Sequence, residues 1–154
     1  MPMLRPGTRA PEFTLPDQDG NPVRLGSLLG ERALVLYFYP ADFTPGCTRE
    51  ACLIRDMHAD IARCGLNVAG VSPQPPDTHR AFREKYHLPF TLLADTDRSV
   101  ARLYRVIGPF GLGIRRATFV IDGAAIIRDA VLADLRIGKH AALIRKALAD
   151  RHAQ

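Results

Sequence analysis

The feature that most constrains this chain is an apolar β-forming run that breaks into a helix carrying a cysteine in its first turn. Residues 33–39 (Ala-Leu-Val-Leu-Tyr-Phe-Tyr) are rich in strand-forming residues, and Pro40 interrupts them. Thr44 suits the N-cap of the next helix and Pro45 its first position. Cys47 then falls at the third position, where unpaired N–H groups and the helix dipole favour a nucleophilic thiolate. From this placement alone, a reactive cysteine and a structural cysteine are equally good interpretations.

Strands alternate with helices along the rest of the chain. Predicted strands cover 11–15, 22–25, 33–39, 66–71, 90–94, 117–122 and 125–132; predicted helices cover a turn at 27–30, 44–63, 77–86 with Asp77 as its cap, a segment ending at Tyr104, and 137–151. This order, with its late strand pair, predicts an α/β fold in which helices flank a mixed central sheet and a hairpin precedes it. We expect one domain over residues 1–154.

The run at 33–39 is apolar on both of its faces, which predicts a central strand buried on both sides. Ligands in α/β folds bind beyond the carboxyl ends of the strands. Cys47 lies just past that end of the predicted central strand, so its position in the fold agrees with a functional role.

Composition restricts the remaining possibilities. The net charge is +5, yet the basic residues are scattered and never form a run of five, so we expect a solvated basic surface and no binding to nucleic acid. No segment has the pattern of a membrane span or a signal peptide. Three cysteines in 154 residues do not make a disulfide scaffold, and we expect a cytoplasmic protein with reduced thiols.

Cys52 follows Cys47 on the same predicted helix, beside Arg49 and Arg55 on a polar face where another thiol could reach it. Five helical residues correspond to about 7.5 Å of rise and about 140° of rotation. The two Cα atoms would then be about 8–9 Å apart, beyond the limit of about 7 Å for a disulfide. A bond between Cys47 and Cys52 therefore requires the first turns of the helix to unwind.

The third cysteine, Cys64, continues an apolar stripe with Ile54 and Ile61, and we predict that it is a small buried hydrophobic residue. Gly65 is predicted to end this helix. Together with His58, the cysteines lack a zinc-site spacing and scatter round the helix, so we expect no metal ion.

Three stretches resemble the peroxiredoxin family in the same order along the chain: Ala-Pro-Glu-Phe-Thr-Leu-Pro-Asp at 10–17, Pro40-x3-Thr44-x2-Cys47, and Arg-Ala-Thr-Phe-Val-Ile-Asp at 116–122. A second cysteine five residues after the first resembles the bacterioferritin-comigratory, or Q-type, subgroup. This resemblance implies a thioredoxin-like fold and a thioredoxin-dependent, atypical 2-Cys peroxidase. Cys47 would attack the peroxide and become a sulfenic acid. Cys52 would condense with it to a disulfide, which thioredoxin or a similar dithiol would reduce.

The resemblance also implies roles for four further residues, each of which has a plainer alternative. Arg116 would stabilise the thiolate and the leaving oxygen, or be an exposed strand arginine. Thr44 would hydrogen-bond the peroxide or simply cap the helix, and Pro40 would shield the pocket or merely end the strand. Glu50 would orient Arg116 or be a solvated acid of the first turns. We expect no cofactor, and a monomer or a weak homodimer.

Two other functions share part of this pattern. A thiol–disulfide oxidoreductase has the same fold but usually carries Cys-x-x-Cys, whereas this chain has Cys-x4-Cys. A redox sensor that passes oxidation to a partner protein through Cys52 would have the same first chemical step as the peroxidase. The sensor therefore stays open as an alternative.

Overall fold

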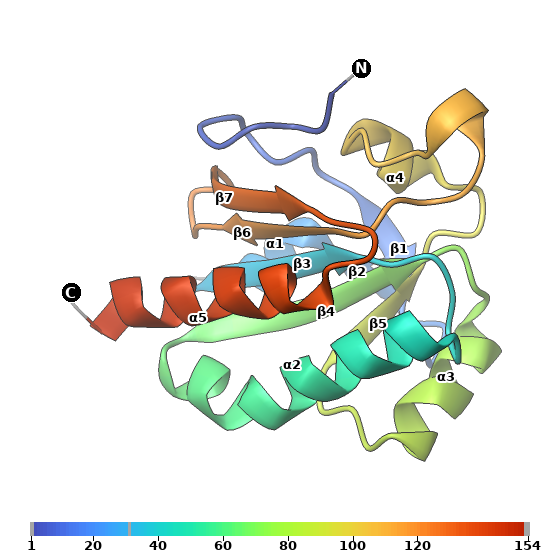
Figure 1. Ribbon diagram of the computed structural model, residues 1–154, viewed down its shortest axis with the longest axis horizontal. Helices are drawn as coiled ribbons and strands as arrows, with labels where there is room; N and C mark the ends of the chain where they lie inside the picture. The colour runs from blue at the N-terminus through green and yellow to red at the C-terminus, as the bar shows by residue number, and fades with distance from the viewer. Residues whose placement is uncertain (1, 31, 153–154) are drawn as a thin grey trace.

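The computed structural model describes residues 2–30 and 32–152. Its strands are β1 (Thr14–Pro16), β2 (Pro22–Arg24), β3 (Ala33–Phe38), β4 (Leu66–Ser72), β5 (Thr91–Ala94), β6 (Ala117–Ile121) and β7 (Ile127–Leu132). Its helices are α1 (Leu25–Leu29), α2 (Pro45–Arg63), α3 (Pro76–Lys85), α4 (Ser99–Leu103), α5 (Ile137–His152) and a short 3-10 turn, η1 (Pro109–Gly111). Figure 1 shows these elements in place.

The main sheet has the order β5-β4-β3-β6-β7, and β1 and β2 form a separate antiparallel hairpin. β3 runs parallel to β4 and antiparallel to β6, so the sheet is mixed as predicted. β3 lies in the middle, and all six of its residues are buried. The predicted α/β fold and its central strand are therefore confirmed.

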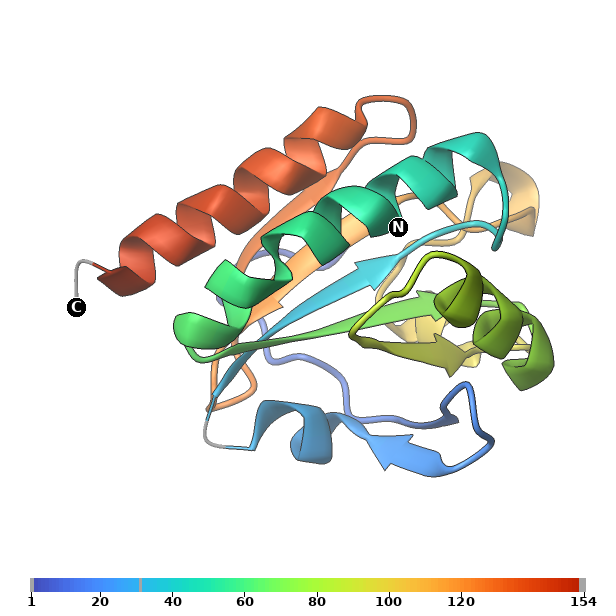
Figure 2. The ribbon, with the colours of Figure 1, turned by 90° about the horizontal axis from the view of Figure 1, so that it is seen from below.

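The sheet separates two apolar cores. Figure 2 shows α2 and α5 side by side on one face, with α1 and the β1–β2 hairpin on the other. Alternate residues of β3 point to opposite faces, so Leu34 and Phe38 enter the core under α1 while Val35 and Tyr37 enter the core under α2. Cys47 belongs to the core under α2. The reacting cysteine of the prediction therefore faces the sheet and not the solvent.

The start of α2 agrees with the prediction in position but not in its hydrogen bond. Thr44 is the N-cap residue and Pro45 opens the helix. The hydroxyl of Thr44 makes no capping bond, however, and donates to the carbonyl of Ala41 at 2.9 Å. Thr44 is therefore the N-cap residue as predicted, but its side chain does not cap the helix.

Two other predictions need correction. Asp77 was predicted to cap α3, but Pro75 is the N-cap residue and Asp77 lies within the first turn. The reason is that Pro76 fits the first helical position, where a missing N–H costs nothing, while an acid one residue later still favours the helix dipole. Cys64 is half-buried at the C-cap of α2, not fully buried. Gly65 follows the helix end as predicted, in a left-handed conformation with φ of 72°.

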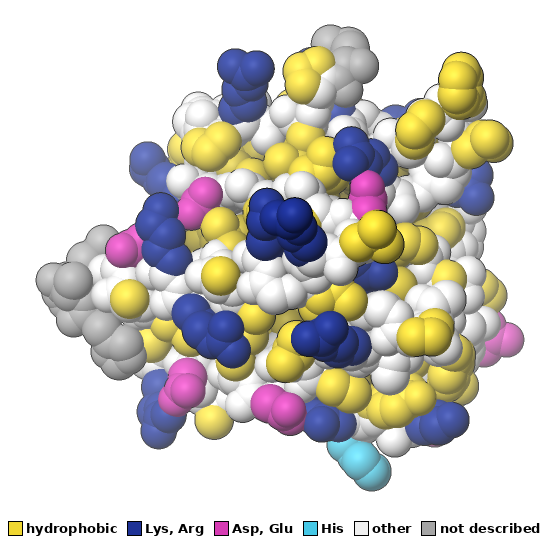
Figure 3. All heavy atoms as spheres, in the orientation of Figure 1, with side chains coloured by type: hydrophobic (Ala, Val, Ile, Leu, Met, Phe, Trp, Pro, Cys, Tyr) yellow, Lys and Arg dark blue, Asp and Glu magenta, His cyan; other side chains and the backbone are white. Residues whose placement is uncertain are grey.

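Charged side chains on the face shown in Figure 3 are scattered, with acidic groups lying among the Lys and Arg side chains. Surface ion pairs of the protein include Arg115 with Asp134 and Lys146 with Asp129. Within residues 2–30 and 32–152, no helix has the length and apolar character needed to cross a lipid bilayer.

Candidate active site

Cys47 sits where a loop from the central strand enters the first turn of α2. The first helical bond of this turn runs from the Thr48 N–H to the Thr44 carbonyl at 2.9 Å, so the N–H groups of Gly46 and Cys47 precede the ladder. Cys47 is 1% exposed. Its sulfur therefore lies at the positive end of a helix and is shielded from bulk water. The helix dipole acts most strongly at such a shielded position.

Arg116 brings a cation into contact with this sulfur. Its Nη2 donates to Cys47 Sγ at 3.4 Å, its Nη1 donates to Glu50 Oε1 at 2.8 Å, and its Nε donates to the Asp134 carbonyl at 3.3 Å. The guanidinium is thus held from three directions, and its side chain is buried. Burial alone lowers the pKa of Arg116, but attraction to Glu50 and Cys47 raises it overall, so this group stays charged.

Gly46 makes room for that guanidinium. A Cβ atom at position 46 would lie 3.1 Å from Arg116 Nη2 and 3.5 Å from the Ile137 Cδ1 methyl. The absence of a side chain therefore lets Arg116 pass close to the helix backbone on its way to Cys47.

Glu50 is buried beside Arg116, with 1% of its surface exposed. The alternative of a solvated acid is therefore wrong. Burial raises the pKa of Glu50 to about 7, because desolvation outweighs the opposing effect of the Arg116 charge and hydrogen bond. One oxygen, Oε1, accepts from Arg116, while Oε2 has no hydrogen-bond partner among the described residues and lies 3.7 Å from His140 Nδ1.

This raised pKa predicts a pH-dependent stability. An acid whose folded-state pKa of about 7 exceeds its ordinary value of 4.5 contributes stability that is complete below 4.5 and is lost as the pH rises through 7. We expect the unfolding free energy of the reduced protein, relative to a Glu50→Gln variant, to fall by on the order of 2–3 kcal/mol between about pH 5 and about pH 8. Urea unfolding of both proteins across this range checks it, and a difference independent of pH would contradict it.

In the described part of the chain, the other predicted site residues, Pro40, Thr44 and Cys52, make no hydrogen bond or ion pair that links them to Cys47 or Arg116. Pro40 is exposed, and its carbonyl accepts from the Ser72 hydroxyl at 3.4 Å. The Thr44 hydroxyl is exposed and keeps its lone pairs free for another donor, since its own hydrogen goes to Ala41. Cys52 is half-buried on the continuous helix α2, and no disulfide joins it to Cys47. Among the predicted site residues, Arg116 thus contacts both Cys47 and Glu50.

A buried polar cluster beneath the loop was missed by the sequence analysis. The Tyr39 hydroxyl donates to Asp42 Oδ1 at 2.6 Å, and Asp42 Oδ2 lies 2.6 Å from His79 Nδ1. His79 Nε2 donates to the Leu93 carbonyl at 3.0 Å. These contacts tie the loop before α2 to β5 and α3 and so fix the approach to Cys47. No local signal could have found them, because an aspartate in a loop and a histidine in a helix are ordinarily solvated.

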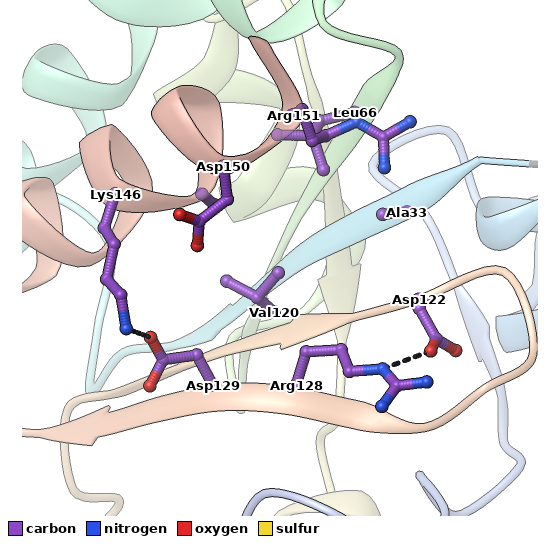
Figure 4. A pocket seen from close by; sticks show the side chains of 10 residues that line it. Ala33, Leu66, Val120, Asp122, Arg128, Asp129, Lys146, Asp150 and Arg151 are labelled. Carbon is purple, nitrogen blue, oxygen red and sulfur yellow. Dashed lines mark hydrogen bonds and ion pairs between the residues drawn. The ribbon is translucent and has the colours of Figure 1, made fainter. Parts of the chain in front are cut away.

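The hollow shown in Figure 4 is a separate feature. It lies between the second half of α5 and the β6–β7 hairpin, near Ala33 at the start of β3. Cys47 follows the opposite end of β3. Arg128 pairs with Asp122 and Lys146 with Asp129 in this hollow, so each of these basic groups already has an acidic partner. We therefore assign the chemistry to the environment of Cys47.

Comparison with known proteins gives consistent similarities over nearly the whole chain. Residues 6–130 match the AhpC/TSA family. A Coxiella burnetii protein named peroxiredoxin bcp is 42% identical over 142 residues, which cover 88% of this chain and 93% of that protein. The crystal structure of peroxidoxin BcpB from Mycobacterium tuberculosis has a TM-score of 0.88 at 37% identity and covers 97% of both chains. Xanthomonas campestris peroxiredoxin Q has a TM-score of 0.84 at 28% identity, covering 99% of this chain and 98% of that one.

Proposed function

Because this chain belongs to the AhpC/TSA family, as a peroxiredoxin of the bcp or Q type, we propose that it is a thiol peroxidase in which Cys47 reacts with peroxide and Cys52 resolves the product. The observation that carries the proposal is the contact between Arg116 Nη2 and Cys47 Sγ at a helix N-terminus. A guanidinium and a helix dipole both favour the charged form of the sulfur.

In the first step, the Cys47 thiolate attacks one oxygen of the peroxide. A sulfur–oxygen bond forms as the oxygen–oxygen bond breaks, so the sulfur is oxidised to a sulfenic acid and the peroxide is reduced. The other oxygen leaves as hydroxide or alkoxide and takes a proton to give water or an alcohol. Arg116 faces the sulfur with a fixed positive charge that stabilises the negative charge as it moves onto the leaving oxygen.

The neighbours of this pair have supporting roles in the proposal. Glu50 holds the Arg116 guanidinium through its Nη1, which leaves Nη2 directed at the sulfur. The Thr44 hydroxyl can accept a hydrogen bond from the peroxide, and Pro40 shapes the entrance. A peroxide is small and offers few groups to bind, so tight placement of these few partners supplies much of the rate.

In the second step, Cys52 attacks the sulfenic acid sulfur, water leaves, and a Cys47–Cys52 disulfide forms. Both cysteines lie on the unbroken helix α2, and the five-residue separation is too long for a disulfide while that helix is intact. The proposal therefore includes unwinding of the first turns of α2. Thioredoxin or a similar dithiol then reduces the exposed disulfide by exchange.

Replacing Cys52 with serine tests this cycle. We expect one rapid turnover with hydrogen peroxide or an organic hydroperoxide, followed by a stall at the Cys47 sulfenic acid, because no second thiol is present to resolve it. Stopped-flow peroxide consumption with thioredoxin and its reductase measures the turnover, and mass spectrometry measures the oxygen added to Cys47. An unchanged thioredoxin-driven rate in this variant would show that Cys52 is not the resolving residue.

Hydrogen exchange of the unmodified protein supplies the matching structural readout. Amides in the first turns of α2 should exchange faster after oxidation than in the reduced state, because a disulfide cannot form on the intact helix. Equal protection in both states would contradict the unwinding. Slow turnover with a stable mixed disulfide to another protein is the result expected of a redox sensor.

A further inference from the structure

Glu50 has a feature that orienting Arg116 does not require. Its Oε1 accepts from Arg116 at 2.8 Å, but Oε2 is buried and has no hydrogen-bond partner among the described residues. A buried carboxylate oxygen without a donor is costly, because nothing replaces the water that it has lost. The polar atom recorded beside Oε2 is His140 Nδ1, at 3.7 Å.

The hydrogen bonds of His140 determine what Oε2 faces. Its Nε2 donates to the Ala133 carbonyl at 2.9 Å, because a carbonyl oxygen can only accept. Burial lowers the pKa of His140, so the imidazole is neutral and its Nδ1 carries a lone pair. That lone pair accepts from the Thr118 hydroxyl at 2.8 Å. An ionised Oε2 would therefore face an electron-rich nitrogen that has no hydrogen to donate to it, and a neutral Oε2 avoids this unfavourable contact.

The charges that surround Glu50 favour the same form. One buried cation, Arg116, contacts both Glu50 and Cys47. Two further groups at this site are neutral: His140 from α5, and Tyr37 from β3, whose pKa burial and Glu50 raise. The Asp134 carboxylate also acts on Arg116 and His140, but it lies at the surface and pairs with Arg115. A thiolate and a carboxylate together would leave one excess buried negative charge. A protonated Glu50 beside a thiolate leaves none.

We propose that Glu50 is protonated while Cys47 is a thiolate, and that Glu50 gives up this proton when Cys47 is oxidised. This inference rests on the proposed peroxidase function. The sulfur donates two electrons to the peroxide and loses its negative charge, and the leaving oxygen takes up one proton. Glu50 releases one proton in the same turnover and becomes the carboxylate that pairs with Arg116. Glu50 is thus a positioning residue that also balances the proton and the charge of the step.

Proton counting in a single turnover tests the inference. A Cys52→Ser protein stops at the sulfenic acid, and a pH-indicator dye in weak buffer reports proton uptake after mixing with hydrogen peroxide. At about pH 6 we expect about zero protons taken up per Cys47 oxidised, and at about pH 9, where Glu50 is already ionised, we expect about one. Adding Glu50→Gln to the Cys52→Ser protein should give an uptake of about one proton per Cys47 oxidised at both pH values. Adding Glu84→Gln, at an exposed position on α3, should leave the parent result unchanged.

Each other outcome overturns the inference. Uptake of one proton at both pH values in the Cys52→Ser protein would mean that Glu50 is ionised throughout. Zero uptake at about pH 6 both with and without Glu50→Gln would mean that the proton comes from the Cys47 thiol itself. If the Glu50→Gln protein fails to fold, infrared difference spectra of the Cys52→Ser protein still decide, since oxidation must remove a protonated-carboxyl stretch. Absence of any oxygen added to Cys47 would instead overturn the proposed function.

Discussion

Replacing Cys47 with serine is expected to abolish peroxide consumption, with a loss of at least about a thousandfold in rate. A serine hydroxyl is not ionised near neutral pH, and the helix dipole and Arg116 do not stabilise the alkoxide enough to ionise it. Serine is also close to cysteine in size, so the buried site should keep its packing. The measurement is stopped-flow consumption of hydrogen peroxide with thioredoxin and its reductase in excess.

Cys64→Ser is the matched control for this experiment. Cys64 lies at the C-cap of α2, at the other end of the same helix, so this substitution removes a sulfur without touching the site. Its activity should stay within about twofold of the unmodified protein, as expected for a half-buried position away from the chemistry. Substantial peroxide turnover by a folded Cys47→Ser protein would refute the assignment of Cys47.

The sequence was sufficient for those parts of the fold that depend on local chemistry. The run at 33–39 is apolar on both faces, and a strand of that kind is stable only between two layers, which is why β3 lies in the centre of the sheet. Pro45 and Gly65 bracket α2 for reasons that involve only the neighbouring backbone. Asp77 shows the limit of such reasoning, because two adjacent prolines moved the helix start back to Pro76.

The site depended on contacts between distant segments, and there the local pattern was ambiguous. Glu50 on a helix is ordinarily solvated, and it is buried here because Arg116, 66 residues later, and His140 on α5 close over it. Arg116 follows Arg115, and only the resemblance to the family distinguished the two. In the structure Arg115 pairs with Asp134 at the surface while Arg116 reaches Cys47. Both residues lie just before β6, and the contacts that separate them, with Asp134 and with Cys47, come from distant segments of the chain.

Replacing Arg116 with methionine is expected to lower kcat/KM for hydrogen peroxide by about a hundredfold to a thousandfold, or about 3–4 kcal/mol of transition-state stabilisation. Methionine keeps most of the apolar volume but removes the charge that faces the sulfur and the leaving oxygen. Arg115→Met is the matched control, because its partner Asp134 is at the surface and such exposed pairs contribute at most about 1 kcal/mol.

The Arg116 variant alone cannot separate catalysis from stability, because it removes the donor that binds the buried Oε1 of Glu50. Leaving a buried polar group without its hydrogen-bond partner destabilises a protein by about 1–3 kcal/mol. The double variant Arg116→Met/Glu50→Leu removes both hydrogen-bonding partners, so its unfolding free energy should recover most of that loss while its rate remains as low as that of Arg116→Met. Urea unfolding and stopped-flow kinetics on the three proteins compare these quantities. Recovery of the rate together with the stability would show that Arg116 supports the fold alone, and the proposed electrostatic role would then be wrong.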